Sequence, residues 1–208
     1  MPRLILRAAA VLAAVTLAGG CSSGKDPKVQ PTPSLPVVTL PPGDLREKVL
    51  QPLEVTTNMV PIAAQTGTRD ATGIAAFSAD PKAAEQALVK NGFQSAYVVQ
   101  YADPAANTVI TNVVTKFATA AGATTDLTAD LTSSAKTGTA FTADGLGEQA
   151  GGVAGKRDDK SPEGSLVTLR WRSGDTTWLL AVSASTPVAQ DGVRKLADKL
   201  MTRLTSAA

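Results

Sequence analysis

The clearest hydrophobic pattern in the chain lies near its C-terminus, where apolar and polar residues alternate along two adjacent segments. Residues 166–172 and 176–184 alternate with a period of two, and Ser173-Gly174-Asp175 between them is a turn sequence. This pattern predicts a β-hairpin with Arg170 and Arg172 on one face. Its apolar face would carry Val167, Leu169, Trp171, Trp178, Leu180 and Val182.

The segment after this hairpin changes to a helical period. Thr186-Pro187 is expected to begin it, because threonine caps helices and proline is favoured in their first turn. Apolar residues then recur three and four positions apart, which predicts an amphipathic helix. Its apolar stripe comprises Ala189, Val193, Leu196, Ala197, Leu200 and Leu204.

The middle of the chain shows the same order of a hairpin followed by a helix. Capping and turn residues set the limits of its elements. The region between residues 54 and 62 gives no clear pattern. The expected elements are a short helix from Asp44 to Leu50, a helix between Asp80-Pro81 and Asn91-Gly92, strands at Phe93–Tyr101 and Thr108–Phe117 around Asp103-Pro104, and a helix from Thr119 to about Ser134.

These elements together predict an α+β fold for residues 44–208. The strands would form a twisted antiparallel sheet with helices packed on one face, because each amphipathic helix must bury its apolar stripe. About 165 residues are enough for one domain with a substantial core. We therefore expect a single domain.

The N-terminal region differs from the rest of the chain. Arg3 and Arg7 precede the apolar run of residues 8–18, and no acidic residue occurs before Asp26. This arrangement is typical of a signal peptide, here residues 1–20. Eleven apolar residues span only about 16 Å as a helix, which is half the thickness of a hydrocarbon core of about 30 Å.

Cys21 directly follows the small residues that end this leader. Leu17-Ala18-Gly19-Gly20-Cys21 resembles the lipobox of bacterial lipoproteins, in which the cysteine is acylated after export. The resemblance implies a palmitate-type anchor at Cys21 and a place on the outer face of the cell membrane. The alternative is an ordinary signal peptide that happens to end near a cysteine. Two or three acyl chains would hold the protein stably, whereas one would not.

The stretch from Cys21 to residue 43 contains six prolines and few large apolar residues. Such a composition favours an extended, disordered tether. At about 3.1 Å per residue it would reach up to roughly 60 Å from the lipid surface. We expect it to separate the domain from the membrane.

Composition excludes several functional classes. The chain has no histidine, which rules out catalytic triads that need one, and histidine-bound zinc or haem. Its one cysteine is assigned to the anchor, so no thiol nucleophile remains. Removing Arg3 and Arg7 leaves eighteen basic residues against eighteen acidic ones, and this balance argues against nucleic acid as a partner. No cofactor or metal is expected.

Two motifs match the residues of catalytic signatures but lack the context that those signatures require. Ser133-Ser134-Ala135-Lys136 and Lys136-Thr137-Gly138 match the S-x-x-K and K-T-G of penicillin-binding proteins, but one lysine would have to serve twice. We interpret them as a helix end and a turn. Gly145-Leu146-Gly147-Glu148-Gln149-Ala150 matches a dinucleotide fingerprint, but Gly151-Gly152 would break the helix that the fingerprint requires. We interpret this motif as a turn between strands.

Two pairs of carboxylates are the remaining catalytic candidates. Asp126 and Asp130 lie four residues apart on the expected helix. Asp158-Asp159 lies among basic residues and is typical of a solvated turn. A hydrolase would need these acids, or Glu148, to meet in one cleft.

Four aromatic residues lie on expected strands with a period of two: Tyr97, Tyr101, Trp171 and Trp178. Large aromatic side chains with this spacing are more often part of a core than of a ligand platform. Both interpretations stay open from the sequence. If a pocket exists, we expect it between this face and a helix.

The C-terminal part also resembles a known group of domains. The order of Gly145–Ala150, the hairpin and the last helix is similar to that in small actinobacterial surface lipoproteins of the mycobacterial type. It also resembles the extracellular sensor domains of mycobacterial receptor kinases, where a glycine-leucine-glycine-acid turn precedes a hairpin and a helix. The resemblance implies binding at the cell envelope and supplies no catalytic residues.

These observations favour a non-catalytic function. The first hypothesis is a lipid-anchored extracytoplasmic module that binds an envelope ligand or partner protein. The alternative is a structural or assembly accessory of an envelope complex that acts through protein contacts. A hydrolase built on acid pairs is the third hypothesis.

Overall fold

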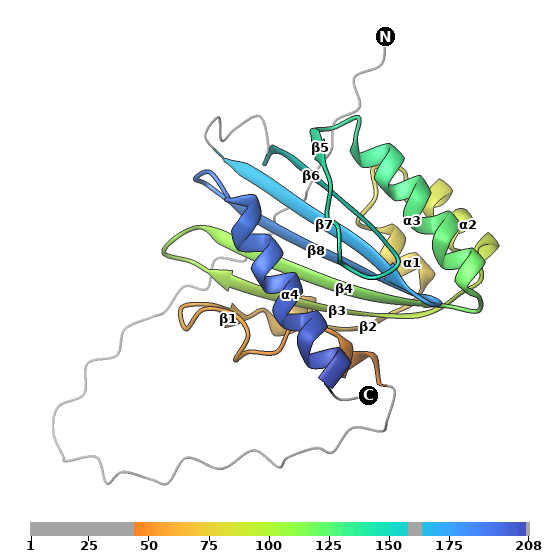
Figure 1. Cartoon of the computed structure of the whole chain (residues 1–208), viewed down its shortest axis with the longest axis horizontal. Coiled ribbons are helices and arrows are strands. Elements are labelled where there is room, and N and C mark those ends of the chain that lie inside the picture. Colours follow the sequence, from red (N-terminus) through yellow and green to blue (C-terminus); the bar gives the residue numbers. More distant parts are fainter. Residues whose placement is uncertain (1–43, 158–163, 207–208) are drawn as a thin grey trace, which may run out of the picture.

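A single antiparallel sheet forms the centre of the molecule (Figure 1). The computed structural model describes residues 44–157 and 164–206. In spatial order the strands are β1 (Val60–Pro61), β3 (Phe93–Asp103), β4 (Thr108–Phe117), β8 (Thr176–Ala184), β7 (Ser165–Ser173), β6 (Gln149–Lys156) and β5 (Thr139–Phe141), with β2 (Gly67–Arg69) also paired to β3. The predicted α+β class and antiparallel sheet are confirmed.

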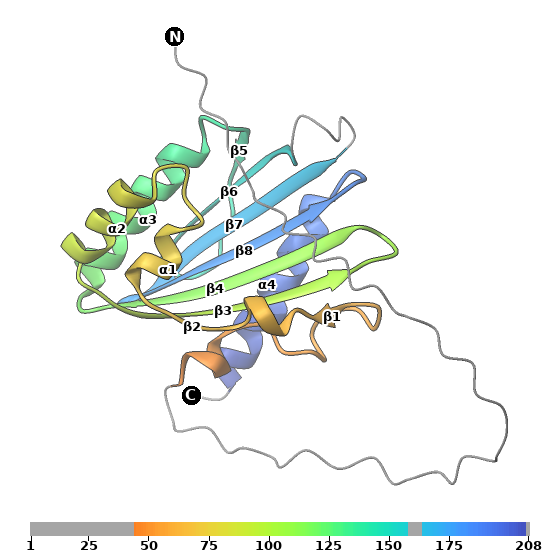
Figure 2. The ribbon, with the colours of Figure 1, turned by 180° about the vertical axis from the view of Figure 1, so that it is seen from behind.

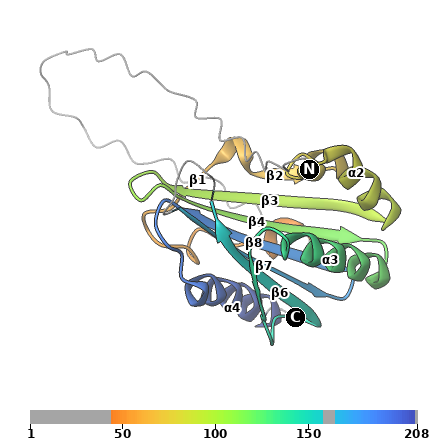
Figure 3. The same ribbon diagram turned by 90° about the horizontal axis from the view of Figure 1, so that it is seen from above.

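The helices lie on both faces of this sheet. Figure 3 shows α4 (Gln190–Ser206) on one side, and α2 (Pro81–Lys90) and α3 (Ala120–Ser134) on the other. Short helix α1 (Ala71–Ala75) packs beside α2. We call the side covered by α4 the first face and the side carrying α1, α2 and α3 the second face. The second helical layer adds to the one layer that the sequence predicted.

The C-terminal hairpin forms where it was predicted and with the predicted faces. Trp171 lies opposite Trp178, and Leu169 lies opposite Leu180. The two indole rings stack with their centroids 6.0 Å apart. They pack beneath α4, whose Val193, Ala197 and Leu200 are buried. The predicted apolar stripe of the last helix therefore belongs to the main core from Val193 to Leu204, whereas Ala189 precedes the helix and is exposed.

Side-chain caps fix the helices of the second face. Asp80 accepts a hydrogen bond from the backbone N–H of Ala83 at 3.1 Å, and Thr119 accepts one from Gly122 at 3.1 Å. Each bond satisfies a backbone group that the first turn leaves without a partner. Phe117 and Ala123 are buried where these helices meet the sheet. The predicted limits of α2 and α3 are confirmed.

The N-terminal segment forms short elements rather than the predicted helix through Leu50. A 3₁₀-helix, η1, covers Leu45–Lys48, and Asp44 caps it by accepting from Arg46 N at 2.9 Å. A second one, η2, covers Ala63–Gln65. Helix formation stops at Lys48 because the following backbone pairs with side chains of the sheet.

Other elements differ from the prediction for local reasons. Helix α4 begins at Gln190 and not at the predicted Thr186-Pro187. Val188 N donates to Ser165 Oγ at 2.6 Å, and this bond holds the segment before the helix extended. Strands β5 and β6 lack an alternating pattern. Glycines replace larger residues there, since a Cβ on Gly152 would lie 2.2 Å from the ring of Phe141. Within the described ranges, no helix is both long enough and apolar enough to cross a membrane.

Two glycines in helices allow a matched test of this packing. A Cβ on Gly122 would lie 2.0 Å from the carbonyl oxygen of Asn91, whereas a Cβ on Gly192 would meet nothing within 4 Å. Gly122→Ala is expected to lower the free energy of unfolding by roughly 1–3 kcal/mol. Gly192→Ala is expected to raise it by roughly 0.5 kcal/mol, because alanine restricts the unfolded chain. Chemical denaturation measures both, and equal effects would contradict the proposed contact.

Candidate functional site

The aromatic residues singled out in the sequence lie on the first face. Tyr101, Trp171 and Trp178 are buried, and Tyr97 is half-buried. Their rings pack in the core between the sheet and α4. Cys21 and Asp158-Asp159 lie outside the described residues.

The polar atoms of two of these rings hold the N-terminal segment. Trp178 Nε1 donates to the carbonyl oxygen of Lys48 at 2.9 Å, and Tyr101 Oη donates to that of Leu50 at 2.9 Å. Burial, followed by the nearby charge of Glu54, raises the pKa of Tyr101 to about 12. The phenol therefore keeps its proton, and its hydrogen bond, throughout the physiological range of pH.

Asn112 adds a third contact from the middle of the sheet. Its side chain is fully buried, with 0% exposure. Oδ1 accepts from Leu50 N at 2.8 Å, and Nδ2 donates to the carbonyl oxygen of Leu179 at 2.9 Å. A polar side chain at this position is stable because its amide is paired on both sides.

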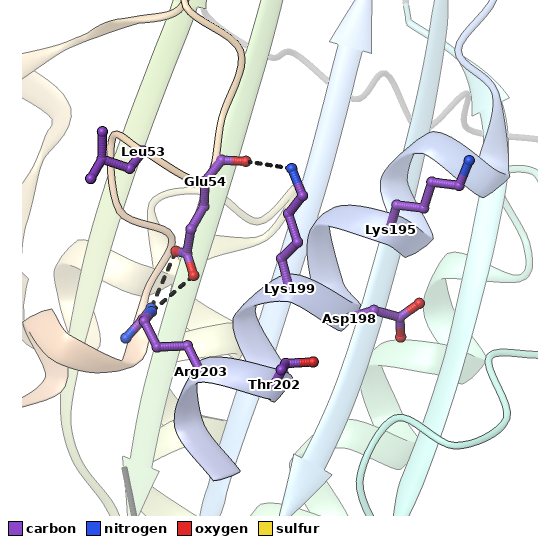
Figure 4. A pocket seen from close by; sticks show the side chains of 7 residues that line it. All are labelled: Leu53, Glu54, Lys195, Asp198, Lys199, Thr202 and Arg203. Carbon is purple, nitrogen blue, oxygen red and sulfur yellow. Dashed lines mark hydrogen bonds and ion pairs between the residues drawn. The ribbon is translucent and has the colours of Figure 1, made fainter. Parts of the chain in front are cut away.

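Arg203 holds the same segment from α4 (Figure 4). Its Nε donates to Glu54 Oε1 at 2.9 Å, and Nη2 donates to the carbonyl oxygen of Val49 at 2.6 Å. Nη1 donates to the carbonyl oxygen of Glu47. We call residues 44–54, together with Tyr101, Asn112, Trp178 and Arg203, the N-terminal clasp.

A tight turn ends the clasp and carries Leu53 at its tip. Glu54 N donates to the carbonyl oxygen of Gln51 at 2.9 Å, while Gln51 N donates to Glu54 Oε2 at 2.6 Å. Pro52 occupies the second position of the turn, where its fixed φ is favoured. Leu53 is 98% exposed. The turn is thus fixed at both ends while its apolar side chain projects outward.

An open groove lies between this turn and α4, with a volume of about 560 Å³. Lys199 Nζ reaches the carbonyl oxygen of Glu54 at 3.5 Å across it (Figure 4). The groove is lined by Leu53, Glu54, Lys195, Asp198, Lys199, Thr202 and Arg203. Most of the lining residues are charged, but apolar atoms form most of the surface that they present to the groove.

The second face of the sheet is only partly covered by helices. Figure 2 shows α1, α2 and α3 gathered over one end of the strands, while β4, β8 and β7 continue past them. On β8 the buried Thr177 lies at the covered end, and Leu179 and Ala181 beyond it are half-buried. We call the half-buried residues beyond the helices the open patch: Gln100, Val109, Thr111, Leu166, Leu179, Ala181 and Ser183.

The predicted acid pair lies on α3. Asp130 pairs with Arg170 at 3.2 Å. Asp126 is half-buried, and burial, followed by the charge of Asp130, raises its pKa to about 6. Glu148 instead pairs with Arg172 at 2.7 Å. Two of the three acids are therefore held in ion pairs with arginines on β7.

The two short motifs have structural roles. Ser134 ends α3, and Lys136 follows in a turn. The other motif is a turn between β5 and β6, as predicted, with Gly147 at a φ of 65°. A Cβ on Gly147 would lie 2.2 Å from the carbonyl oxygen of Arg172. Glu148 then accepts from Gly174 N at 2.8 Å and holds the tip of the β7–β8 hairpin.

Asp126 makes stability depend on pH. Its folded pKa of about 6 lies above its ordinary value of 3.8, so the folded chain binds this proton more tightly than the unfolded chain. Stability is expected to fall as pH rises through that window and to stay lower above it. Asp126→Asn should flatten this profile and raise the free energy of unfolding at neutral pH by on the order of 1 kcal/mol.

Urea unfolding between pH 4 and pH 8 measures the profile. Asp144→Asn is the control, because Asp144 is exposed and lies in the turn before β6, outside α3. It should bring no comparable gain at neutral pH. Parallel profiles for the native chain and Asp126→Asn would contradict the assignment.

Comparison with solved structures shows a fold like that of the extracellular domain of PknH from Mycobacterium tuberculosis. The two share a TM-score of 0.51 and 11% sequence identity, over 76% of this chain and 94% of that one. No family model matches the chain. No curated protein sequence matches it either. In fold, the match supports the predicted resemblance to the extracellular domains of mycobacterial receptor kinases.

Proposed function

We propose that the protein is a lipid-anchored, extracytoplasmic and non-catalytic binding module. The anchor is proposed at Cys21, and the tether leads from there to Asp44. From Asp44 onward the chain enters the N-terminal clasp, so the tether would join the domain at a segment that is hydrogen-bonded to the core. This attachment suits a domain held by its N-terminus.

The location is supported by two independent observations. Residues 1–21 have the order of charge, apolar run and cysteine that lipoprotein leaders have. The fold is like that of a domain described as extracellular. Together they favour the outer face of the cell membrane.

The absence of catalysis is supported by the residues and their arrangement. The chain has no histidine. Asp130 and Glu148 are each held by an arginine, so neither is placed as a free general base. Asp126 has the raised pKa of a candidate acid. Its described neighbours, however, are Asn91, Asp130 and Arg170, so it lies where α3 packs on the rest of the domain.

The open patch is the observation that carries a binding function. Its aliphatic side chains alternate with hydroxyl and amide groups on four adjacent strands, β3, β4, β8 and β7. In a sheet, such side chains are usually covered by a second layer. Among the described residues, that layer ends with α1, α2 and α3. A ligand or partner would complete the layer.

An accessory role in an envelope complex is the second candidate. The form of the open patch favours it, because an uncovered, partly apolar sheet surface suits a protein partner. The two candidates share the surface and differ in what covers it. The mass of the bound species therefore decides between them.

Cys21→Ala tests the anchor. The substitution removes the acylated thiol, so the protein is expected to move from the membrane fraction to the soluble fraction. Fractionation followed by immunoblotting measures this change, and labelled palmitate should enter the native protein alone. Unchanged membrane association of the variant, or a native protein that takes up no label, would contradict the anchor.

Thr111→Arg tests the open patch. Thr111 is half-buried in the centre of the patch, where a long charged side chain would block a partner. Native mass spectrometry of protein taken from its own envelope should show a bound species. The fraction of protein that carries this species should be at least tenfold lower for the variant. Thr68→Arg, at an exposed position on β2 outside the patch, is the control and should retain it. An empty native protein would contradict a binding function.

A further inference from the structure

Leu53 is an unusual residue for the surface of this domain. It is 98% exposed, although the turn that carries it is fixed by two hydrogen bonds between Gln51 and Glu54. Arg203 holds Glu54 in addition. A flexible loop could fold an apolar side chain against the protein, but this turn cannot. The structure therefore presents Leu53 to whatever lies next to this surface.

Two lysines lie on the same side of the molecule. Lys195 and Lys199 line the groove beside Leu53 and belong to exposed positions of α4 (Figure 4). In the described part of the chain, neither lysine belongs to an ion pair. The acids of the groove are already paired, Glu54 with Arg203 and Asp198 with Arg194. The surface thus combines an outward apolar side chain with two positive charges, of which Lys199 also contacts the carbonyl oxygen of Glu54.

The first described segment of the chain lies at this surface. The described chain begins at Asp44, and Arg203 contacts both the carbonyl oxygen of Glu47 and the carboxylate of Glu54. The start of the domain and the Leu53 turn are therefore joined by a single side chain. The twenty-two residues 22–43 connect this point to Cys21.

We propose that the Leu53 turn and the lysines of α4 dock on an anionic lipid bilayer. Leu53 would enter the headgroup boundary, and Lys195 and Lys199 would contact acidic headgroups. A lysine close to an anionic membrane strengthens binding about fivefold, and exposed apolar side chains add to it. The proposal rests on the proposed lipid anchor, which would hold the domain beside the bilayer and so strengthen a contact that the domain also makes without it.

Docking in this way fixes the orientation of the domain. The groove lies beside α4 on the first face, whereas the open patch lies on the second face of the same sheet. With the first face toward the lipid, the patch is directed away from the membrane. The two surfaces then serve different contacts without competing.

Sedimentation with vesicles tests this surface separately from the anchor. The probe is the unacylated Cys21→Ala protein, mixed either with vesicles of equal parts phosphatidylglycerol and phosphatidylcholine or with phosphatidylcholine alone. Binding is expected to the anionic vesicles only, and to weaken as salt is added. Lys195→Glu with Lys199→Glu should reduce the association constant at least tenfold, and Leu53→Ser about fivefold.

Matched changes on α2 provide the controls. Lys82→Glu with Lys90→Glu changes the net charge equally, and Val89→Ser removes an apolar side chain that is 64% exposed. Both should bind as the parent does, and circular dichroism should show that every variant is folded. Failure of the parent to sediment with anionic vesicles, or equal loss in groove and control variants, overturns the inference. Palmitate labelling of the native protein reports on the anchor independently, so the two failures are distinguishable.

Discussion

The backbone of residues 47–50 lies against the core, where buried polar groups need hydrogen-bond partners. Four side chains supply them from β3, β4, β8 and α4, namely Tyr101, Asn112, Trp178 and Arg203. An unpaired buried group costs about 1–3 kcal/mol, so these contacts decide whether the segment stays in place. The groove and the Leu53 turn exist because this segment is held against α4. The first and last described elements are thereby fixed to one face of the sheet.

The elements that could be predicted from the sequence are those with strong periodicity or a capping residue. The alternation of residues 166–184 defined both the hairpin and its faces, and Asp80 and Thr119 defined the starts of α2 and α3. Strand β6 has no such pattern, because its glycines make room for Phe141 and Leu131. The second helical layer was not predicted, since amphipathic patterns do not say which face of a sheet a helix will cover.

The candidate site was less accessible to sequence reasoning. Asn112 left a signal, as a polar residue in an otherwise apolar alternation of Ile110 and Val114, and that signal could have marked a buried contact. The sequence gives no such signal for Arg203, because an arginine near the end of an amphipathic helix normally faces solvent. The aromatic positions were found, but the roles of their polar atoms depend on a segment that is distant in sequence. The open patch depends on where the helices of the second face end, which is a tertiary property.

The position of β8 determines when the protein can fold. It is the last strand in the sequence, yet it lies between β4 and β7. A chain that emerges from a ribosome or an export channel with its N-terminus first must leave one edge of β4 without a partner until β8 follows. An unpaired edge of this kind favours association with other chains. Completion of the sheet therefore waits until β8 has emerged, so the strands cannot be added to the sheet one by one in sequence order.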